Sequence, residues 1–304
     1  MKRTKRLTVT VGVPAYNEET NIGNLLKSVL EQKGNFKLEK LIVVGDGCTD
    51  KTARVVREYR KRDKRVALVA GRERMGKMAR LNQIYEKNKS DIIFTFDADV
   101  VLSNEAVVET MLDKFRRDRN VVLVAAHQVP VKPETYKERI FFTAYRLWEE
   151  TRIDVNGGDH IHNLQGGATA LRRDLAGNIR YPRTVLTDQG YLYLRAREFG
   201  KFAYSYKSVV MYRTVGNLSD YRKLSARTLG RDQQTLVVHF GERIFQEYKI
   251  PAFYKLRATL KYLARSPFYT TCALGVNFFV RVVPNKDGIE PGWVVLGSTK
   301  KAIV

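Results

Sequence analysis

The chain of 304 residues is poor in cysteine and has no long hydrophobic run. Its two cysteines, Cys48 and Cys272, form no C-x-x-C pair, which argues against a disulfide framework and against a structural zinc site. The longest stretch with little charge, Pro267–Val283, contains Asn277 and Arg281. It falls short of the roughly 20 apolar residues that a membrane-spanning helix needs.

A secretory signal peptide and an excess of acidic residues are lacking too. The apolar run Leu7–Val13 is too short for the hydrophobic region of a signal peptide, so we expect a reducing, cytoplasmic location. Only 32 Asp and Glu stand against 54 Lys and Arg, which gives a formal net charge of +22. This charge predicts an anionic partner, such as nucleotide phosphates, nucleic acid or an anionic membrane surface.

What the chain does have is an alternation of strand and helix patterns over its first 130 residues. Apolar residues at helical spacing separate short apolar runs that are typical of buried strands. The alternation predicts an α/β fold with a mostly parallel central sheet and helices on both faces. The expected strands are Leu7–Val13, Leu41–Val44, Val66–Ala70, Ile92–Phe96 and Val121–Ala126.

Polar side chains follow three of these strands where each strand ends. Glu18 follows the first, Asp46 the second, and Asp97 and Asp99 the fourth. Ligands of parallel sheets bind beyond the carboxyl ends of the strands, so these side chains are expected to share one site. Alternate residues of an extended segment point the same way, so both carboxylates of the Asp97–Asp99 pair can address one Mn²⁺ or Mg²⁺ ion.

The rest of the chain predicts mainly helices, among them 141–152, 188–199 and one long helix over 220–240. The helix expected at Ala252–Arg265 is amphipathic and has a basic stripe beside its apolar face. Two interpretations stay open: the helix lies on a membrane surface, or it packs on the core with a solvated basic edge. Its apolar face holds Phe253, Leu256, Leu260 and Leu263, and its stripe holds Arg257, Lys261 and Arg265.

Six segments carry motifs in a fixed order within residues 7–232. They are Val13–Glu18 (P-x-Y-N-E), Val44–Asp50 (D-D-G-S-T-D), Gly76–Asn82 (G-K-x-x-A-L-N), Asp97–Asp99 (D-x-D), Gln165–Arg173 (G-G…R-R) and Thr187–Gly200 (T-E-D-x-x-L-x-x-R…G). In these segments the chain resembles the family 2 inverting glycosyltransferases, which have the GT-A fold. Gly45 and Cys48 depart from the second motif.

The resemblance implies a catalytic domain over residues 1–240 and a basic amphipathic extension over 241–304. Residues 1–130 would bind the nucleotide sugar, linked to UDP or GDP, and residues 131–240 the acceptor. Asp46 would read the base, Lys77 would face the diphosphate, and Asp99 would hold the metal with Asp97 near the donor sugar. The remaining implied contacts are Pro14, Ala15 and Glu18 at the nucleoside, and Gly166, Gly167 and Gln189 on the acceptor side.

The catalytic base is expected at Asp188. Spacing to Leu192 and Arg195 puts Asp188 at the E position of the family motif and Gln189 at the D position, where the usual base stands. Asp188 is the only carboxylate left in the motif, and a base must first reach the acceptor hydroxyl. The alternative is that Asp188 only caps the helix that follows.

A further family motif, Q-x-x-R-W, is only partly present. Arg227 matches its arginine, whereas Leu224 and Thr228 replace its glutamine and tryptophan, which disfavours the processive polysaccharide synthases. Arg227 and Arg231 are expected to reach the diphosphate. Whether a histidine completes the metal site stays open, the candidates being His160, His162 and His239.

These observations predict a metal-dependent inverting glycosyltransferase with a lipid-linked or membrane-associated acceptor, peripheral on the cytoplasmic face of a membrane. One alternative is sugar transfer to nucleic acid, for which the net charge of +22 is equally suited. An alternative of another class is a non-catalytic protein that binds nucleotide sugars. The retained carboxylates at positions 99 and 188 argue against it.

Overall fold

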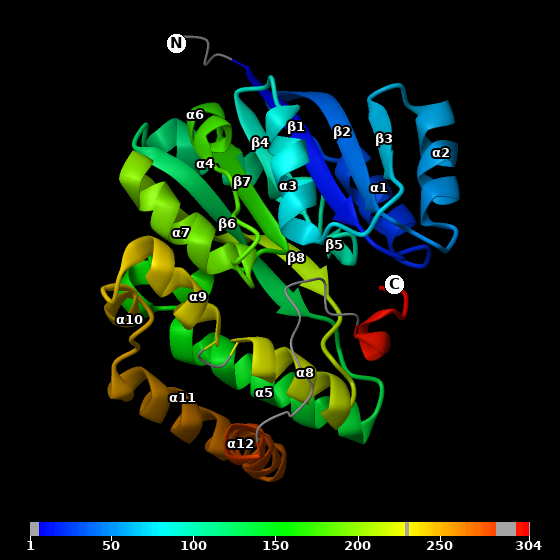
Figure 1. Cartoon of the computed structure of the whole chain (residues 1–304). Helices are drawn as coiled ribbons and strands as arrows, with labels where there is room; N and C mark the ends of the chain where they lie inside the picture. Colours follow the sequence, from blue (N-terminus) through cyan, green and yellow to red (C-terminus); the bar gives the residue numbers. More distant parts are fainter. Residues whose placement is uncertain (1–5, 229–230, 284–295, 304) are drawn as a thin grey trace.

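A computed structural model describes residues 6–228, 231–283 and 296–303 of the chain (Figure 1). One eight-stranded sheet with the order β3-β2-β1-β4-β7-β6-β8-β5 runs through its centre. The strands are β1 (Leu7–Ala15), β2 (Phe36–Asp46), β3 (Val66–Gly71), β4 (Ile92–Phe96), β5 (Val100–Leu102), β6 (Val121–Pro130), β7 (Ala168–Arg172) and β8 (Lys201–Tyr212).

The sheet is parallel in its first half and mixed in its second. β1 pairs in parallel with β2 and β4, and β2 pairs in parallel with β3. β7 is antiparallel to both β4 and β6, and β5 is antiparallel to β8. The α/β class predicted from the alternating patterns is confirmed. The antiparallel strands were not expected, because β5 has three residues and β7 five, too few to show a period.

Helices cover both faces of the sheet, as expected. The helices are α1 (Ile22–Leu30), α2 (Thr52–Arg62), α3 (Lys77–Glu86), α4 (Val107–Arg117), α5 (Tyr136–Arg152), α6 (Arg173–Asn178), α7 (Asp188–Phe199), α8 (Leu218–Thr228), α9 (Arg231–Phe240), α10 (Ile244–Glu247), α11 (Ala252–Arg265) and α12 (Pro267–Val282).

The pleat of β2 shows how one strand serves two cores. Leu41 and Val43 join a cluster that includes residues of α1, α2 and α4. Ile42 and Val44 join a second cluster with residues of α3, α6 and α7. Burying each such side chain stabilises the fold by about 1.5–3 kcal/mol. A continuous apolar run is therefore required here, and it is what made this strand predictable from the sequence.

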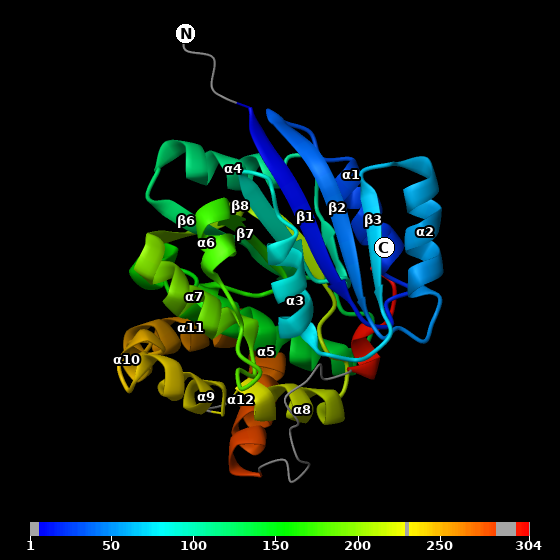
Figure 2. The same ribbon diagram turned by 45° about the horizontal axis from the view of Figure 1, so that its top comes forward.

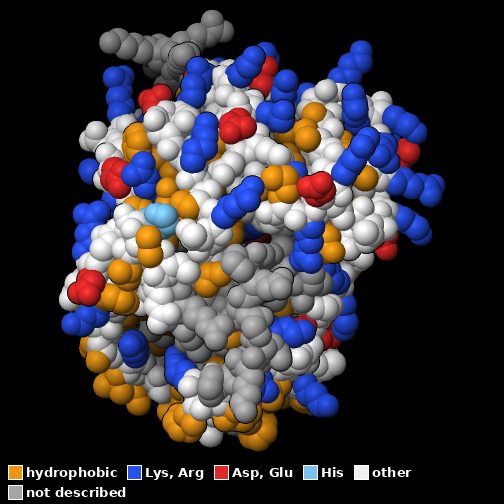
Figure 3. Space-filling view, viewed as in Figure 1, with side chains coloured by type: hydrophobic (Ala, Val, Ile, Leu, Met, Phe, Trp, Pro, Cys, Tyr) orange, Lys and Arg blue, Asp and Glu red, His pale blue; other side chains and the backbone are white. Residues whose placement is uncertain are grey.

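A further layer of helices lies below the sheet in Figure 1, where α11 and α12 pack against α5. Within the single helix expected over 220–240 the structure describes two, α8 and α9, and residues 229–230 between them lie outside the described part. In the space-filling view, hydrophobic side chains gather along the lower edge of the molecule, where α11 and α12 lie, and basic side chains spread over the upper part (Figure 3). None of the described helices is long and apolar enough to cross a membrane.

Residues 297–303 lie far from α12 in space and close to the end of β1 and the start of α1. Figures 1 and 2 both show this segment beside the carboxyl ends of β1 and β2. Ile303 is buried there, its N–H donates to Asn21 Oδ1 and its carbonyl accepts from Asn24 Nδ2. The segment thus forms part of the sheet edge at which the sequence predicts a ligand.

Candidate active site

Lys77 joins two of the predicted site residues. It is the first residue of α3, and its Nζ lies 2.6 Å from Asp97 Oδ1 and 3.0 Å from Asp188 Oδ2. Burial lowers the pKa of Lys77, but the negative charges of Asp188 and Asp97 outweigh that effect and raise it above its ordinary value. Two carboxylates that are 91 positions apart in the sequence therefore meet at one ammonium group.

Asp97 and Asp99 lie in the turn between β4 and β5, not on an extended strand. The strand argument for parallel side chains is therefore wrong, although the two carboxylates still interact. Burial and the charges of Asp99 and Asp188 raise the pKa of Asp97 to about 6 despite Lys77, and burial also raises the pKa of Asp99. The turn thus concentrates negative charge that additional positive charge would stabilise.

Asp188 is the first residue of α7, and its neighbour Gln189 points elsewhere. Asp188 is 5% exposed and faces Lys77, whereas Gln189 is exposed to solvent. Glycine at position 166 makes room for this carboxylate, since a Cβ there would lie 2.3 Å from Asp188 Oδ2. A Cβ at Gly167 would in turn lie 2.7 Å from Gln128 Oε1. The two glycines of the predicted acceptor segment thus pack against polar side chains.

Asp46 is fully buried and its carboxylate already has several partners. It accepts hydrogen bonds from the N–H groups of Met75 and Gly76, and Arg80 Nε donates to it at 2.8 Å. Arg80 stands one turn after Lys77 on α3, so Asp46 fixes the start of the helix that presents Lys77. Base reading by Asp46 stays a prediction.

Glu18 is buried next to the turn of Asp97–Asp99. Its carboxylate accepts a hydrogen bond from Lys300, which belongs to the segment 297–303. Burial and the charge of Asp99 raise the pKa of Glu18 to about 7, while Lys300 acts in the opposite direction. Pro14 and Ala15 are buried at the end of β1, on the same sheet edge.

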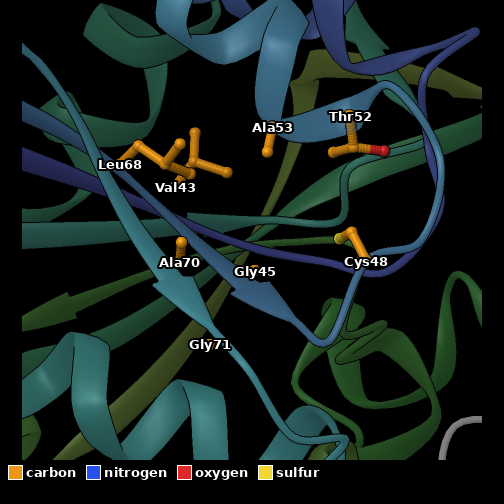
Figure 4. Close-up of a pocket in the computed structure, with 8 residues that line it drawn as sticks. All are labelled: Val43, Gly45, Cys48, Thr52, Ala53, Leu68, Ala70 and Gly71. Carbon is orange, nitrogen blue, oxygen red and sulfur yellow. The ribbon is translucent and has the colours of Figure 1, made fainter.

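A small pocket of about 50 Å³ lies between the strands β2 and β3 and the start of α2, shown in Figure 4. Its walls are apolar or small side chains, and the two departures from the family motif, Gly45 and Cys48, both line it. Cys48 Sγ donates to the carbonyl of Ala15 at 3.3 Å, which ties this wall to the end of β1. No residue of β1 lines the pocket, so Cys48 is its link to the strand end that is expected to line the nucleoside site.

The histidines belong to other parts of the structure. His160 and His162 bond to the backbone carbonyls of Lys249 and Tyr248, and His239 lies near Thr184 Oγ1. Among residues 6–228, 231–283 and 296–303, no three His, Cys, Asp or Glu side chains form a complete metal site. Arg227 and Arg231 lie on α8 and α9, but their side chains are outside the described part, so their role stays a prediction.

The sequence did not single out three site residues. Arg80 could have been found, because buried Asp46 needs a cationic partner and Arg80 lies one helical turn from Lys77. Gln128, whose Nε2 donates to the carbonyl of Gln165, comes from a long apolar strand. Lys300 could not be predicted as a site residue, since no sequence pattern near it shows that residues 297–303 lie beside β1.

The chain belongs to the family of glycosyl transferases described as glycosyl transferase family 2, whose pattern matches residues 10–180. Among curated proteins, it is 27% identical over 172 residues to a dolichyl-phosphate β-glucosyltransferase, ALG5D, of Trichomonas vaginalis. That match covers 53% of this chain and 52% of the relative. The chain thus spans about half the length of that relative.

Two solved structures share the fold. The mannosyltransferase PcManGT from Pyrobaculum calidifontis, in complex with GDP-Man and Mn²⁺, aligns with a TM-score of 0.56 at 22% identity, over 93% of this chain and 77% of that one. S. aureus TarS in complex with UDP-GlcNAc aligns with a TM-score of 0.54 at 16% identity, over 92% and 93% of the two chains. The chain therefore has the GT-A fold that its motifs predict.

Proposed function

We propose that this chain is a metal-dependent inverting glycosyltransferase that moves a sugar from a nucleoside-diphosphate donor to the hydroxyl of a lipid-linked acceptor at a membrane surface. The observation that carries the proposal is the meeting of Lys77 with Asp97 and Asp188. Lys77 and Asp97 come from motifs expected to bind the donor, and Asp188 comes from the motif expected to supply the catalytic base.

Asp188 is the general base in this proposal. It accepts the proton of the acceptor hydroxyl while that oxygen attacks the anomeric carbon from the face opposite the leaving diphosphate, so the configuration inverts in one displacement. Lys77 and the close approach of Gly166 hold the carboxylate in place. A positioned base contributes about 10²–10⁴-fold to the rate.

Asp99, with Asp97, is the proposed holder of Mn²⁺ or Mg²⁺. A site with only one or two carboxylates fits these ions, which keep waters and bind substrate phosphates in addition to protein oxygens. When bound, the cation stabilises negative charge on the leaving diphosphate. Support also comes from the fold relative that was solved with GDP-Man and Mn²⁺.

The membrane surface in the proposal rests on how α11 is attached. Two of the three residues of its basic stripe are tied to the protein, since Arg257 pairs with Asp154 and Lys261 pairs with Glu150. Its apolar face is turned outward, and α12 continues that surface: Phe253 is 66% exposed and Phe268 is 69% exposed. The helix packs on α5 and still presents its apolar side, which supports the proposed membrane surface.

An exposed apolar surface of this kind needs an apolar partner, because each Å² left in water costs about 25 cal/mol. A lipid surface suits it, given the formal net charge of +22. The relative from Trichomonas vaginalis is named for dolichyl phosphate, which is a lipid phosphate. From here on, the apolar face means the exposed apolar side chains of α11 and α12 together.

A thermal-shift panel tests the proposed activity class. UDP, GDP, CDP and ADP, each with and without Mn²⁺, are added to the purified protein. One nucleotide is expected to raise the melting temperature, by more with Mn²⁺ than without it, because a ligand that binds only the native state stabilises it. No stabilisation by any nucleotide at millimolar concentration with Mn²⁺ would contradict the proposal.

A further inference from the structure

Lys300 has all of its hydrogen-bond donors directed at the turn after β1. An ammonium group has three N–H donors. Here they meet the carboxylate of Glu18, the carbonyl of Asn17 at 3.0 Å and the carbonyl of Tyr16 at 3.3 Å. Lys300 therefore binds the main chain and the acidic side chain of one turn at the same time.

The same turn is tied into the walls of the nucleoside site. The guanidinium of Arg74 lies 4.2 Å from the centre of the Tyr16 ring. Asn17 has a positive φ of 50° and accepts from the N–H of Thr49 at 2.8 Å, in the motif that follows β2. A shift of the turn would therefore move the loops after β2 and β3.

The segment that carries Lys300, residues 297–303, is held on both halves of the molecule, and we call it the clasp. On the side of β1, Ile303 is buried between Asn21 and Asn24. On the side of β8, Ser298 donates from both its N–H and its hydroxyl to Asp220 Oδ2, and Arg213 donates to the carbonyl of Ala302. Anchors on both sides fix the position of Lys300 between them.

We propose that the clasp is a working part of the donor site and that Lys300 is a positioning residue, which acts through Glu18 and the Tyr16–Glu18 turn to shape the site for the nucleoside of the donor. The inference rests on the proposed function and adds to it a determinant of donor affinity. No family motif of this chain contains the clasp.

The physical reason is the cost of leaving Glu18 without its cation. Glu18 is 5% exposed and lies close to the negative charge of Asp99. A buried carboxylate that loses its ionic partner must move towards water or take up a proton. Either response changes the turn that Lys300 also holds by its two carbonyl groups.

The test compares Lys300→Met with Lys301→Met in titrations with the nucleoside diphosphate that stabilises the wild-type protein, at fixed Mn²⁺. Lys301 is a matched control, since it is the adjacent lysine and pairs at the surface with Glu134 and Glu138. Lys300→Met is expected to weaken binding by about tenfold to a hundredfold, the range for a lost hydrogen bond to a charged group. Lys301→Met is expected to change it less than about twofold.

A double-mutant cycle separates positioning from a direct contact or a loss of fold. If Lys300 acts through Glu18, then Lys300→Met has little further effect on affinity in a Glu18→Gln background. Glu18→Gln also removes the unpaired buried charge, so the double variant is expected to fold even where Lys300→Met alone does not.

Three results would overturn the inference while the wild type still binds the nucleotide. They are unchanged affinity in Lys300→Met, tighter binding in that variant, and additive effects of the two substitutions. Failure of the wild-type protein to bind any nucleotide would instead contradict the proposed function, so the two failures are distinguishable.

Discussion

Asp188 and Gln189 show how the start of a helix separates two neighbouring side chains. The first faces the interior and Lys77, and the second faces solvent. The sequence could place a carboxylate at position 188 and not at 189, but it could not show the direction of either side chain. The geometry supports the choice of Asp188, which stays a proposal until its chemistry is measured.

Replacing Asp188 by Asn tests its role as base. We expect turnover at saturating substrates to fall by about 10²–10⁴-fold, because the amide cannot accept the proton. The affinity for the nucleotide is expected to change little, since Asp97 still pairs with Lys77. Asp174→Asn, an exposed aspartate in the first turn of α6, is the control. Turnover close to wild type, with chemistry rate-limiting, would exclude Asp188 as the base.

Gly166 provides a separate test of the same geometry. Gly166→Ala would place a Cβ 2.3 Å from Asp188 Oδ2, so the carboxylate must move. We expect turnover to fall at least tenfold, since displacement of a catalytic group by about 1 Å can cost about 10²-fold. Gly177→Ala is the control, because no atom lies within 4 Å of its added Cβ. Equal turnover in the two variants would show that the contact has no importance for the reaction.

At the scale of elements, patterns of apolar residues predicted two helices with their observed bounds, whereas the strand expected at Leu41–Val44 is the longer β2, Phe36–Asp46. The helix expected over 188–199 is α7, and the helix expected at Ala252–Arg265 is α11. Within the long helix expected at 220–240 the structure describes α8 and α9, and the apolar pattern gave no sign of two elements there. The orientation of α11 could not be predicted either, since its ion pairs with Asp154 and Glu150 depend on the tertiary fold.

A buried histidine, His162 in the 3₁₀ turn Ile161–Asn163 (η2), is expected to lower the free energy of unfolding in acid. His162 lies between Trp148, His160 and the carbonyl of Tyr248. Burial and the positive charges of His160, Arg152 and Lys255 lower the pKa of His162 to about 3. The unfolded chain takes up a proton on this histidine below about pH 6.5 and the native state does not, so stability falls as the pH decreases from 6.5.

Between pH 6.5 and pH 5, His162 is expected to cost about 2 kcal/mol of the free energy of unfolding. Urea unfolding at the two pH values measures the change. The variant His162→Gln retains a donor for the carbonyl of Tyr248 but does not titrate, so its stability is expected to vary less over this range. An equal pH dependence in the variant and the wild type would contradict the assignment.

At the scale of the whole molecule, the apolar face and the proposed donor site lie at different places. The proposed donor site is at the carboxyl ends of β1, β2 and β4, and α11 and α12 lie below the sheet on the far side of α5 (Figure 1). The sequence could suggest a donor site because its motifs are local, and that site stays a prediction. The division into a domain of residues 1–240 and an extension stays a prediction, and the clasp of residues 297–303 contacts both halves of that domain.

Flotation with liposomes tests the apolar face. We expect the protein to float with vesicles that contain anionic lipid at low salt, and less so at high salt. The double variant Phe253→Ser and Phe268→Ser is expected to lose most of this binding, because it removes two of the most exposed apolar side chains. Phe199→Ser, a change at the end of α7, is the control. If the double variant still binds the vesicles as well as the wild type does, the apolar face is excluded as the membrane-binding surface.

The bond between Lys300 and Glu18 joins residues 282 positions apart. A ribosome releases a chain from its first residue onward, and early segments begin to fold during synthesis. β1 to β4 are thus complete while the lysine that neutralises Glu18 has yet to be added. On the proposal above, the newly made chain would therefore pass through a stage in which β1 to β4 are present but the affinity for the sugar donor is still low, and the affinity would rise once Lys300 has been added and has reached Glu18.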